Sequence, residues 1–133
     1  MTSLGAEIAM DLPFDDAVAR VTEALAAEGF GVISRIDMDR AFREKLGAEF
    51  RRYAILGACN PKLAMKAVTA RPDVGLLLPC NVTVEEDGAG AVVRIVDAAT
   101  MMGAAGLDSH PAIAELAEDA GARLARVAAA LRG

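Results

Sequence analysis

The order of apolar and polar positions along the chain predicts five strands and four helices. Strand patterns run over residues 7–12, 30–38 and 53–59, and a hairpin joins strands at 82–86 and 92–96. Apolar positions recur at helical spacing over residues 14–28, 39–46, 61–70 and, in the longest helix, 110–131. Residues 97–108 show neither period, so we expect an irregular segment there.

Details of this pattern predict how some elements pack. Residues 53–59 are apolar on both faces, which is typical of a central strand covered on both sides. Gly57 inside that strand indicates a bulge or the close approach of another group. In the short helix at 39–46, Phe42 and Leu46 are the expected buried pair.

The predicted order is strand, helix, strand, helix, strand, helix, hairpin, helix. Helices interleaved with strands at this density favour an α+β fold, with helices packed on one mixed sheet of about five strands. A length of 133 residues fits a single domain over 1–133, with no internal repeat or linker. A doubly wound nucleotide-binding fold is disfavoured, because Asp11-Leu12-Pro13-Phe14 stands where a glycine-rich turn belongs.

Charge and composition narrow the classes of partner. The net charge of −5 argues against nucleic acid, which requires a clustered basic surface. No apolar run is long enough to cross a membrane, and no secretory signal is recognisable at the N-terminus, so we expect a cytoplasmic protein. In that compartment the two cysteines are expected to be reduced thiols. The regular apolar stripe of the last helix favours a homodimer.

Cys59-Asn60-Pro61 is the sharpest local motif. It ends a strand and opens a helix, with Asn60 as N-cap and Pro61 at the first helical position. A thiol there faces free backbone N–H groups and the positive end of the helix dipole, which favour a thiolate. The same groups can hold an anion. The alternative is that Cys59 is a small apolar side chain in the core.

Pro79-Cys80-Asn81 mirrors the first motif at the start of the hairpin. The sequence leaves open whether the two motifs meet, because that depends on the strand order. The spacing is not C-x-x-C, so thioredoxin-type chemistry has little support. Two thiols also fall short of the four ligands of a structural zinc site, and we expect no metal and no cofactor.

Three stretches resemble a known family: Glu28-Gly29-Phe30-Gly31-Val32, Ile55-Leu56-Gly57-Ala58-Cys59-Asn60-Pro61, and Gly75-Leu76-Leu77-Leu78-Pro79-Cys80-Asn81-Val82. Together they resemble the domain-of-unknown-function family DUF302, which occurs in bacteria and archaea. The resemblance covers about residues 8–102 and leaves the C-terminal helix outside. It implies a compact α+β domain, compatible with a dimer, and it carries no established reaction.

Three hypotheses for function follow, and none includes a complete catalytic constellation. The first is a binding module for a small ligand or anion, with a site formed by Gly57, Cys59, Asn60, Cys80 and Asn81. The second is a thiol-based redox enzyme or sensor that uses Cys59 and Cys80. The third is an interaction subunit that acts through a dimer surface, with both cysteines as packing residues.

Overall fold

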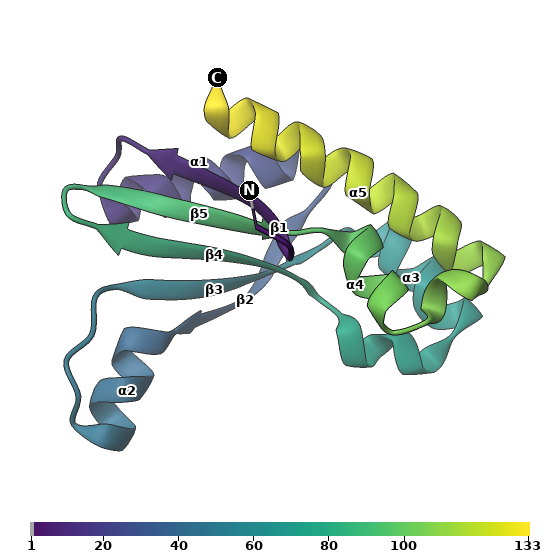
Figure 1. The fold of residues 1–133 in the computed structure, drawn as a ribbon, viewed down its shortest axis with the longest axis horizontal. Coiled ribbons are helices and arrows are strands. Elements are labelled where there is room, and N and C mark those ends of the chain that lie inside the picture. Colours follow the sequence, from purple (N-terminus) through teal and green to yellow (C-terminus); the bar gives the residue numbers. More distant parts are fainter. Residues whose placement is uncertain (1) are drawn as a thin grey trace.

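The computed structural model describes residues 2–133, which form one five-stranded sheet and the helices packed beside it (Figure 1). The strands are β1 (Gly5–Met10), β2 (Gly31–Asp37), β3 (Tyr53–Cys59), β4 (Cys80–Asp87) and β5 (Gly90–Val96). The helices are α1 (Phe14–Ala27), α2 (Met38–Leu46), α3 (Pro61–Ala70), α4 (Ala98–Ala104) and α5 (Pro111–Arg132), with short 3-10 helices η1 (Pro72–Leu77) and η2 (Leu107–Ser109). The predicted α+β class is confirmed.

The sheet has the order β1-β5-β4-β3-β2, and every neighbouring pair is antiparallel, whereas the sequence suggested a mixed sheet. The reason lies in the connections. After β3 the chain leaves the sheet through α3 and η1 and re-enters at the same end, so that Cys80 pairs with Ala58. The two strands joined by α1, β1 and β2, lie at opposite edges and form no parallel pair.

One face of the sheet carries the main core. Ala54, Leu56 and Ala58 of β3 are at most 1% exposed, and they pack into a cluster with α1 and α5. The opposite face of β3 carries Tyr53 and Ile55, which are only half-buried. The expectation that β3 is covered on both faces is therefore wrong. On neighbouring strands that second face carries polar ion pairs instead of a second layer of helices.

Those ion pairs form a chain across the open face. Arg94 of β5 donates hydrogen bonds to Glu7 of β1 at 2.8 Å and to Glu85 of β4 at 2.7 Å, and Glu85 also accepts one from Arg51. The register places Arg94 opposite Glu7 and Thr83, so the three strands present these side chains on one face. Charged side chains at half-exposed positions explain why this face tolerates solvent.

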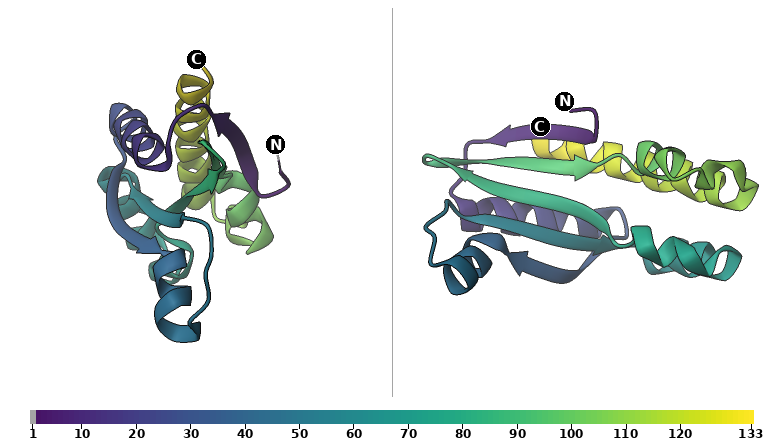
Figure 2. Two further views of the ribbon diagram at one scale, coloured as in Figure 1. Left: turned by 90° about the vertical axis from the view of Figure 1, so that its left-hand side faces the viewer. Right: turned by 60° about the horizontal axis from the view of Figure 1, so that its bottom comes forward.

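A cap of helices extends beyond one end of the sheet (Figures 1 and 2). It contains α3, η1, α4, η2 and the first half of α5, around a small second core that includes Val74, Met102 and Ile113. Residues 97–108, expected to be irregular, form α4 and η2. The Asp97 side chain caps α4 by accepting hydrogen bonds from the N–H groups of Ala99 and Thr100.

Helix α2 projects away from the sheet between β2 and β3 (Figure 1). It has no buried residue, and Leu46 is 75% exposed. Phe42 is half-buried and packs edge-on against the ring of Phe50, with the ring centroids 5.2 Å apart. The expected burial of Phe42 and Leu46 is therefore wrong, because a helix on a projecting arm has no core to pack against.

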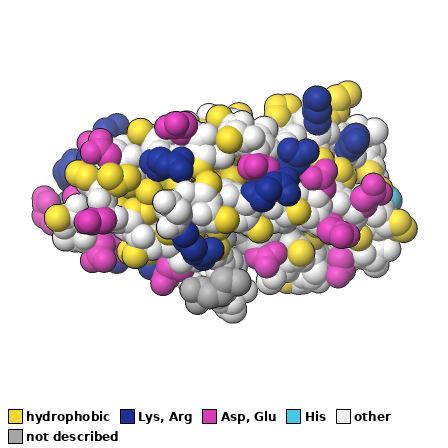
Figure 3. Space-filling view, turned by 90° about the horizontal axis from the view of Figure 1, so that it is seen from above, with side chains coloured by type: hydrophobic (Ala, Val, Ile, Leu, Met, Phe, Trp, Pro, Cys, Tyr) yellow, Lys and Arg dark blue, Asp and Glu magenta, His cyan; other side chains and the backbone are white. Residues whose placement is uncertain are grey.

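The apolar stripe of α5 is accounted for by contacts within one chain. Leu124, Val127 and Leu131 lie in the main core, and Ile113 lies in the second core. The homodimer therefore stays a prediction. On the face seen in Figure 3, basic and acidic side chains are interspersed and no large patch of one sign forms. Across residues 2–133, no helix combines the length and the apolar character needed to span a bilayer.

Candidate functional site

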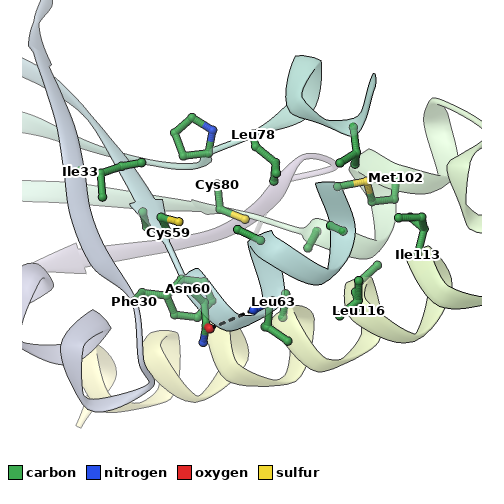
Figure 4. Close-up of a pocket in the computed structure, with 18 residues that line it drawn as sticks. Phe30, Ile33, Cys59, Asn60, Leu63, Leu78, Cys80, Met102, Ile113 and Leu116 are labelled. Atoms are coloured by element: carbon green, nitrogen blue, oxygen red, sulfur yellow. Dashed lines mark hydrogen bonds between the residues drawn. The ribbon is translucent and has the colours of Figure 1, made fainter. Parts of the chain in front are cut away.

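A cavity of about 290 Å³ lies between the end of the sheet and the helical cap (Figure 4). Its lining comes from the ends of β3 and β4, from β2 and the residue before it, from α3, α4 and α5, and from the segment that precedes β4. The lining residues are Phe30, Ile33, Ala58, Cys59, Asn60, Leu63, Ala64, Ala67, Val74, Leu78, Pro79, Cys80, Ala98, Met102, Ile113, Leu116, Ala117 and Ala120. Ile33 is 65% exposed, so it stands at the opening. Such a volume is close to the lower end of known small-molecule sites, about 300–1,000 Å³.

The two cysteine motifs meet in this cavity. Because β3 and β4 are antiparallel and Cys80 lies opposite Ala58, Cys80 is one residue out of register with Cys59. Figure 4 shows the side chains of Cys59 and Cys80 both directed into the cavity. Both are free thiols; Cys59 is half-buried and Cys80 is 7% exposed. The question that the sequence left open is settled by the antiparallel return of the chain through α3.

Asn60 is the buried polar side chain of the cavity wall, at 9% exposure. Its Oδ1 accepts a hydrogen bond from the N–H of Leu63 at 3.3 Å, which confirms it as the N-cap of α3. Pro61 at the first position has no N–H to satisfy, and the N–H of Ala64 bonds to the carbonyl of Asn60 at 2.8 Å. Most backbone N–H groups in the first turn of α3 thus either have a hydrogen-bond partner within the chain or, at Pro61, are missing.

Gly57 and Asn81 pair with each other across β3 and β4, and neither is among the residues that line the cavity. Asn81 is exposed. Gly57 is buried, and an added Cβ there would lie 2.6 Å from Cγ of Pro79 and would also clash with Oγ of Ser34. The close approach expected at Gly57 is therefore present, next to a bulge in β2 between Val32 and Ser34. Gly57 thus lies against Pro79, which is part of the cavity wall.

The wall of the cavity is apolar. Among the described residues that line it, none is an Asp, Glu, Lys, Arg or His. Burial raises the pKa of the Cys80 thiol, and the neighbouring Cys59 raises it further. Cys80 is therefore a neutral thiol near pH 7. Within residues 2–133 no cluster of three or more His, Cys, Asp or Glu side chains has the arrangement of a metal site.

This arrangement suits an uncharged apolar molecule better than an anion. An engineered apolar cavity of about 150 Å³ holds benzene, so a space near twice that size holds a larger hydrocarbon body. A charged ligand would lose its hydration without gaining a counter-charge from the lining. Asn60 and the two thiols are the polar contacts available on the side chains.

Much of the cavity wall was not anticipated from the sequence. Met102 of α4 and Leu116 and Ala120 of α5 lie more than forty positions from Cys59 along the chain, and none of them was among the predicted ligand-binding residues. The available signal was the apolar stripe of α5, which has two separate packing partners: the sheet at its C-terminal half and the cap at its N-terminal half.

Comparison with known proteins connects the whole described fold to one family. Residues 6–131 match the family model "Domain of unknown function DUF302", and this range includes α5. The similar solved structures include the crystal structure of an uncharacterised conserved DUF302 protein from Bacillus stearothermophilus. Its TM-score is 0.85 at 26% sequence identity, over 98% of this chain and 100% of that chain. No curated protein is significantly similar to the chain.

Proposed function

Starting from the fact that the chain belongs to the DUF302 family, we propose that it is a binding module for a small, uncharged, apolar molecule. The observation that supports this most strongly is the cavity between the sheet end and the helical cap, with its uncharged lining. The two cores of the molecule lie on either side of it, so a ligand there would contact both. Ligand binding would then tie the cap to the sheet.

The polar groups of the wall limit the ligand to few hydrogen bonds. Oδ1 of Asn60 is already engaged with Leu63, and Cys80 offers a neutral thiol. A ligand with an apolar body and at most one or two weakly polar groups satisfies this wall without leaving a buried polar atom unpaired. The binding of an anion, which the sequence also suggested, has less support because the start of α3 is capped internally.

Two dyes that share one body can test this proposal. N-phenyl-1-naphthylamine is uncharged, and 8-anilino-1-naphthalenesulfonate carries the same rings with a sulfonate. We expect the uncharged dye to bind one site per chain with a fluorescence increase, and the sulfonate to bind at least tenfold more weakly. Tighter binding of the sulfonate would favour the anion site, and binding of neither dye would overturn the proposal.

A matched pair of substitutions on α5 locates the binding site. Ala120 lines the cavity, and Ala122 lies two residues on and is exposed. We expect Ala120→Phe to fill part of the cavity and weaken binding of the uncharged dye at least tenfold, while Ala122→Phe leaves it unchanged. Equal affinities in the two variants would show that the dye binds elsewhere. Circular dichroism and thermal unfolding of both variants establish that each is folded.

A further inference from the structure

The outer face of α3 is exposed to solvent and mixes apolar with basic side chains. Four exposed residues recur at positions i, i+3, i+4 and i+7 and therefore share one face of the helix: Lys62, Met65, Lys66 and Thr69. The opposite face of the helix lines the cavity through residues such as Leu63. Helix α3 therefore presents one face to the cavity and a second, chemically different face to the surroundings of the molecule.

Further exposed apolar side chains lie beside this face and at the opening of the cavity. Val68 of α3 is exposed, and Leu76 of η1, which packs against α3, is 88% exposed. Ile33 stands at the cavity opening on β2, the strand next to β3, and α3 begins just after the end of β3. Together with Met65 these are four of the eight large apolar side chains that are exposed within residues 2–133. Single exposed apolar side chains are common, whereas a group of them beside a cavity opening indicates an interaction surface.

The charge of this part of the chain is opposite in sign to that of the whole. Residues 60–79 contain three basic side chains and one acidic side chain, a net charge of +2, whereas the full chain carries −5. The acidic one, Asp73, pairs with Arg71 at 2.8 Å. Lys62 and Lys66 take part in no ion pair within the part of the chain that the structure describes. Acidic side chains more than about 10 Å away are largely screened at physiological salt, so the two lysines are available to an anionic partner.

The outer cap surface is defined by five exposed residues: Lys62, Met65, Lys66, Val68 and Leu76. We propose that this surface docks on an anionic lipid bilayer, and that apolar ligands pass there between the bilayer and the cavity. This inference rests on the proposed function, because it names the source of the ligand for the same cavity. Ammonium groups attract anionic headgroups, and exposed apolar side chains bury themselves at the boundary between headgroups and acyl chains.

The cavity favours a bilayer over an acidic protein as the partner. A bilayer stores apolar molecules, and an opening beside it lets such a molecule leave the hydrocarbon with little exposure to water. Helix α3 has 10 residues, about half of the roughly 20 needed to cross a bilayer, so the contact lies at the membrane surface. The lysines hold the protein there and the apolar side chains place the opening near the acyl chains.

Co-sedimentation with vesicles tests the docking surface. The vesicles consist of phosphatidylcholine alone or of phosphatidylcholine mixed with anionic phosphatidylserine. We expect the wild-type protein to bind the anionic vesicles at least tenfold more tightly than the neutral ones. This preference should disappear when the salt concentration is raised from about 0.1 M to 1 M, because the Debye length falls from about 10 Å to 3 Å. Equal binding to both kinds of vesicle, or binding to neither, would overturn the inference.

Matched variants on α3 and α2 locate the contact. Replacing both Lys62 and Lys66 by glutamine should weaken binding to anionic vesicles at least tenfold, since each lysine at such a surface contributes about fivefold. Lys45→Gln on α2 removes another exposed lysine without an ion-pair partner in the described chain and should change binding less than twofold. Met65→Ser should weaken binding, whereas Leu46→Ser, at a similarly exposed position of α2, should not. Equal losses from the α3 and α2 variants would contradict the docking surface, and circular dichroism establishes that each variant is folded.

The uncharged dye N-phenyl-1-naphthylamine separates this inference from the proposed function. Without vesicles, the double lysine variant should bind the dye as tightly as wild type, because neither lysine lines the cavity. With dye-loaded anionic vesicles, the variant should take up the dye at least tenfold more slowly than wild type in stopped-flow fluorescence. Dye binding without vesicle binding, or equal uptake rates, would overturn the inference while the proposed function stands. Vesicle binding without dye binding would refute the proposed function, and the transfer of ligand with it.

Discussion

Replacing Gly57 by alanine tests how closely the wall behind the cavity is packed. Gly57 lies in β3 between Ser34 of β2 and Asn81 of β4. A Cβ at this position would lie 2.6 Å from Cγ of Pro79, whereas carbon atoms in contact are normally about 3.5–4.0 Å apart. Something has to move by about 1 Å to accept the methyl group.

The structure indicates which neighbour has to move. Ser34 is exposed, so its hydroxyl can rotate away at small cost. Pro79 is a ring in the cavity wall, next to Cys80, and has no such freedom. Overpacking of this kind costs about 1–3 kcal/mol. For a domain of this size that corresponds to a fall in Tm of about 3–6 °C for each kcal/mol. The displaced wall should also weaken dye binding.

Urea unfolding followed by circular dichroism measures the free energy of unfolding directly. Gly31→Ala is the matched control, because an added Cβ at Gly31 meets nothing within 4 Å. We expect Gly31→Ala to change stability by less than about 0.5 kcal/mol. In a double-mutant cycle, Pro79→Ala should recover part of the loss caused by Gly57→Ala. A Gly57→Ala protein as stable as wild type, with unchanged dye affinity, would refute the reasoning.

Substitutions at two further positions test other contacts. Asn60→Ala removes the cap of α3 and should cost about 1 kcal/mol in urea unfolding, while Asn60→Asp keeps an acceptor and should cost less; equal losses would contradict the capping role. Hydrogen bonds from Arg94 and then Arg51 hold the pKa of Glu85 below its ordinary range, so this carboxylate stabilises the fold at neutral pH and loses that effect as pH falls through its folded-state pKa. Glu85→Gln should therefore cost about 1 kcal/mol at pH 7, with the gap to wild type narrowing once the pH falls below about 4, near the pKa of an ordinary glutamate. A gap that stays constant on acidification would show that the ion pairs do not contribute.

The helix ends and the hairpin turn were predictable from sequence because they depend on neighbouring residues alone. Asn60 and Pro61 mark the start of α3 through a cap and a missing N–H, and Gly29 adopts a left-handed φ of 85° just after α1. The hairpin of β4 and β5 follows from alternation around Gly88 and Ala89. Each of these features is encoded within a few positions.

The predictions that were wrong concern features that depend on contacts between distant segments. Leu46 carries the apolar spacing of a packed helix, yet α2 projects from the body and leaves it exposed. Likewise, the apolar character of both faces of β3 did not reveal that its second face lies beside the ion pairs of Arg94. Burial is a property of the assembled fold, and the same local pattern is compatible with either outcome.

The candidate site was half predictable for the same reason. Cys59, Asn60 and Cys80 stood out through their local motifs, and the structure brings them together. The cavity itself requires the antiparallel return through α3 and the placement of α4 and α5 around it. No spacing in the sequence specifies that α4 and α5 complete its wall. Gly57 and Asn81 were chosen by adjacency in sequence, and pairing across the strands places them outside the cavity lining.

The most direct test of the central claim is to observe the cavity wall while an apolar molecule binds. Methyl-labelled methionine gives separate NMR reporters: Met102 lines the cavity, and Met65 on α3 is 74% exposed and lies outside its lining. On titration with N-phenyl-1-naphthylamine, we expect the Met102 methyl resonance to shift through the ring currents of the bound dye and to saturate, while Met65 stays unchanged. A shift at Met65 with none at Met102 would contradict the account.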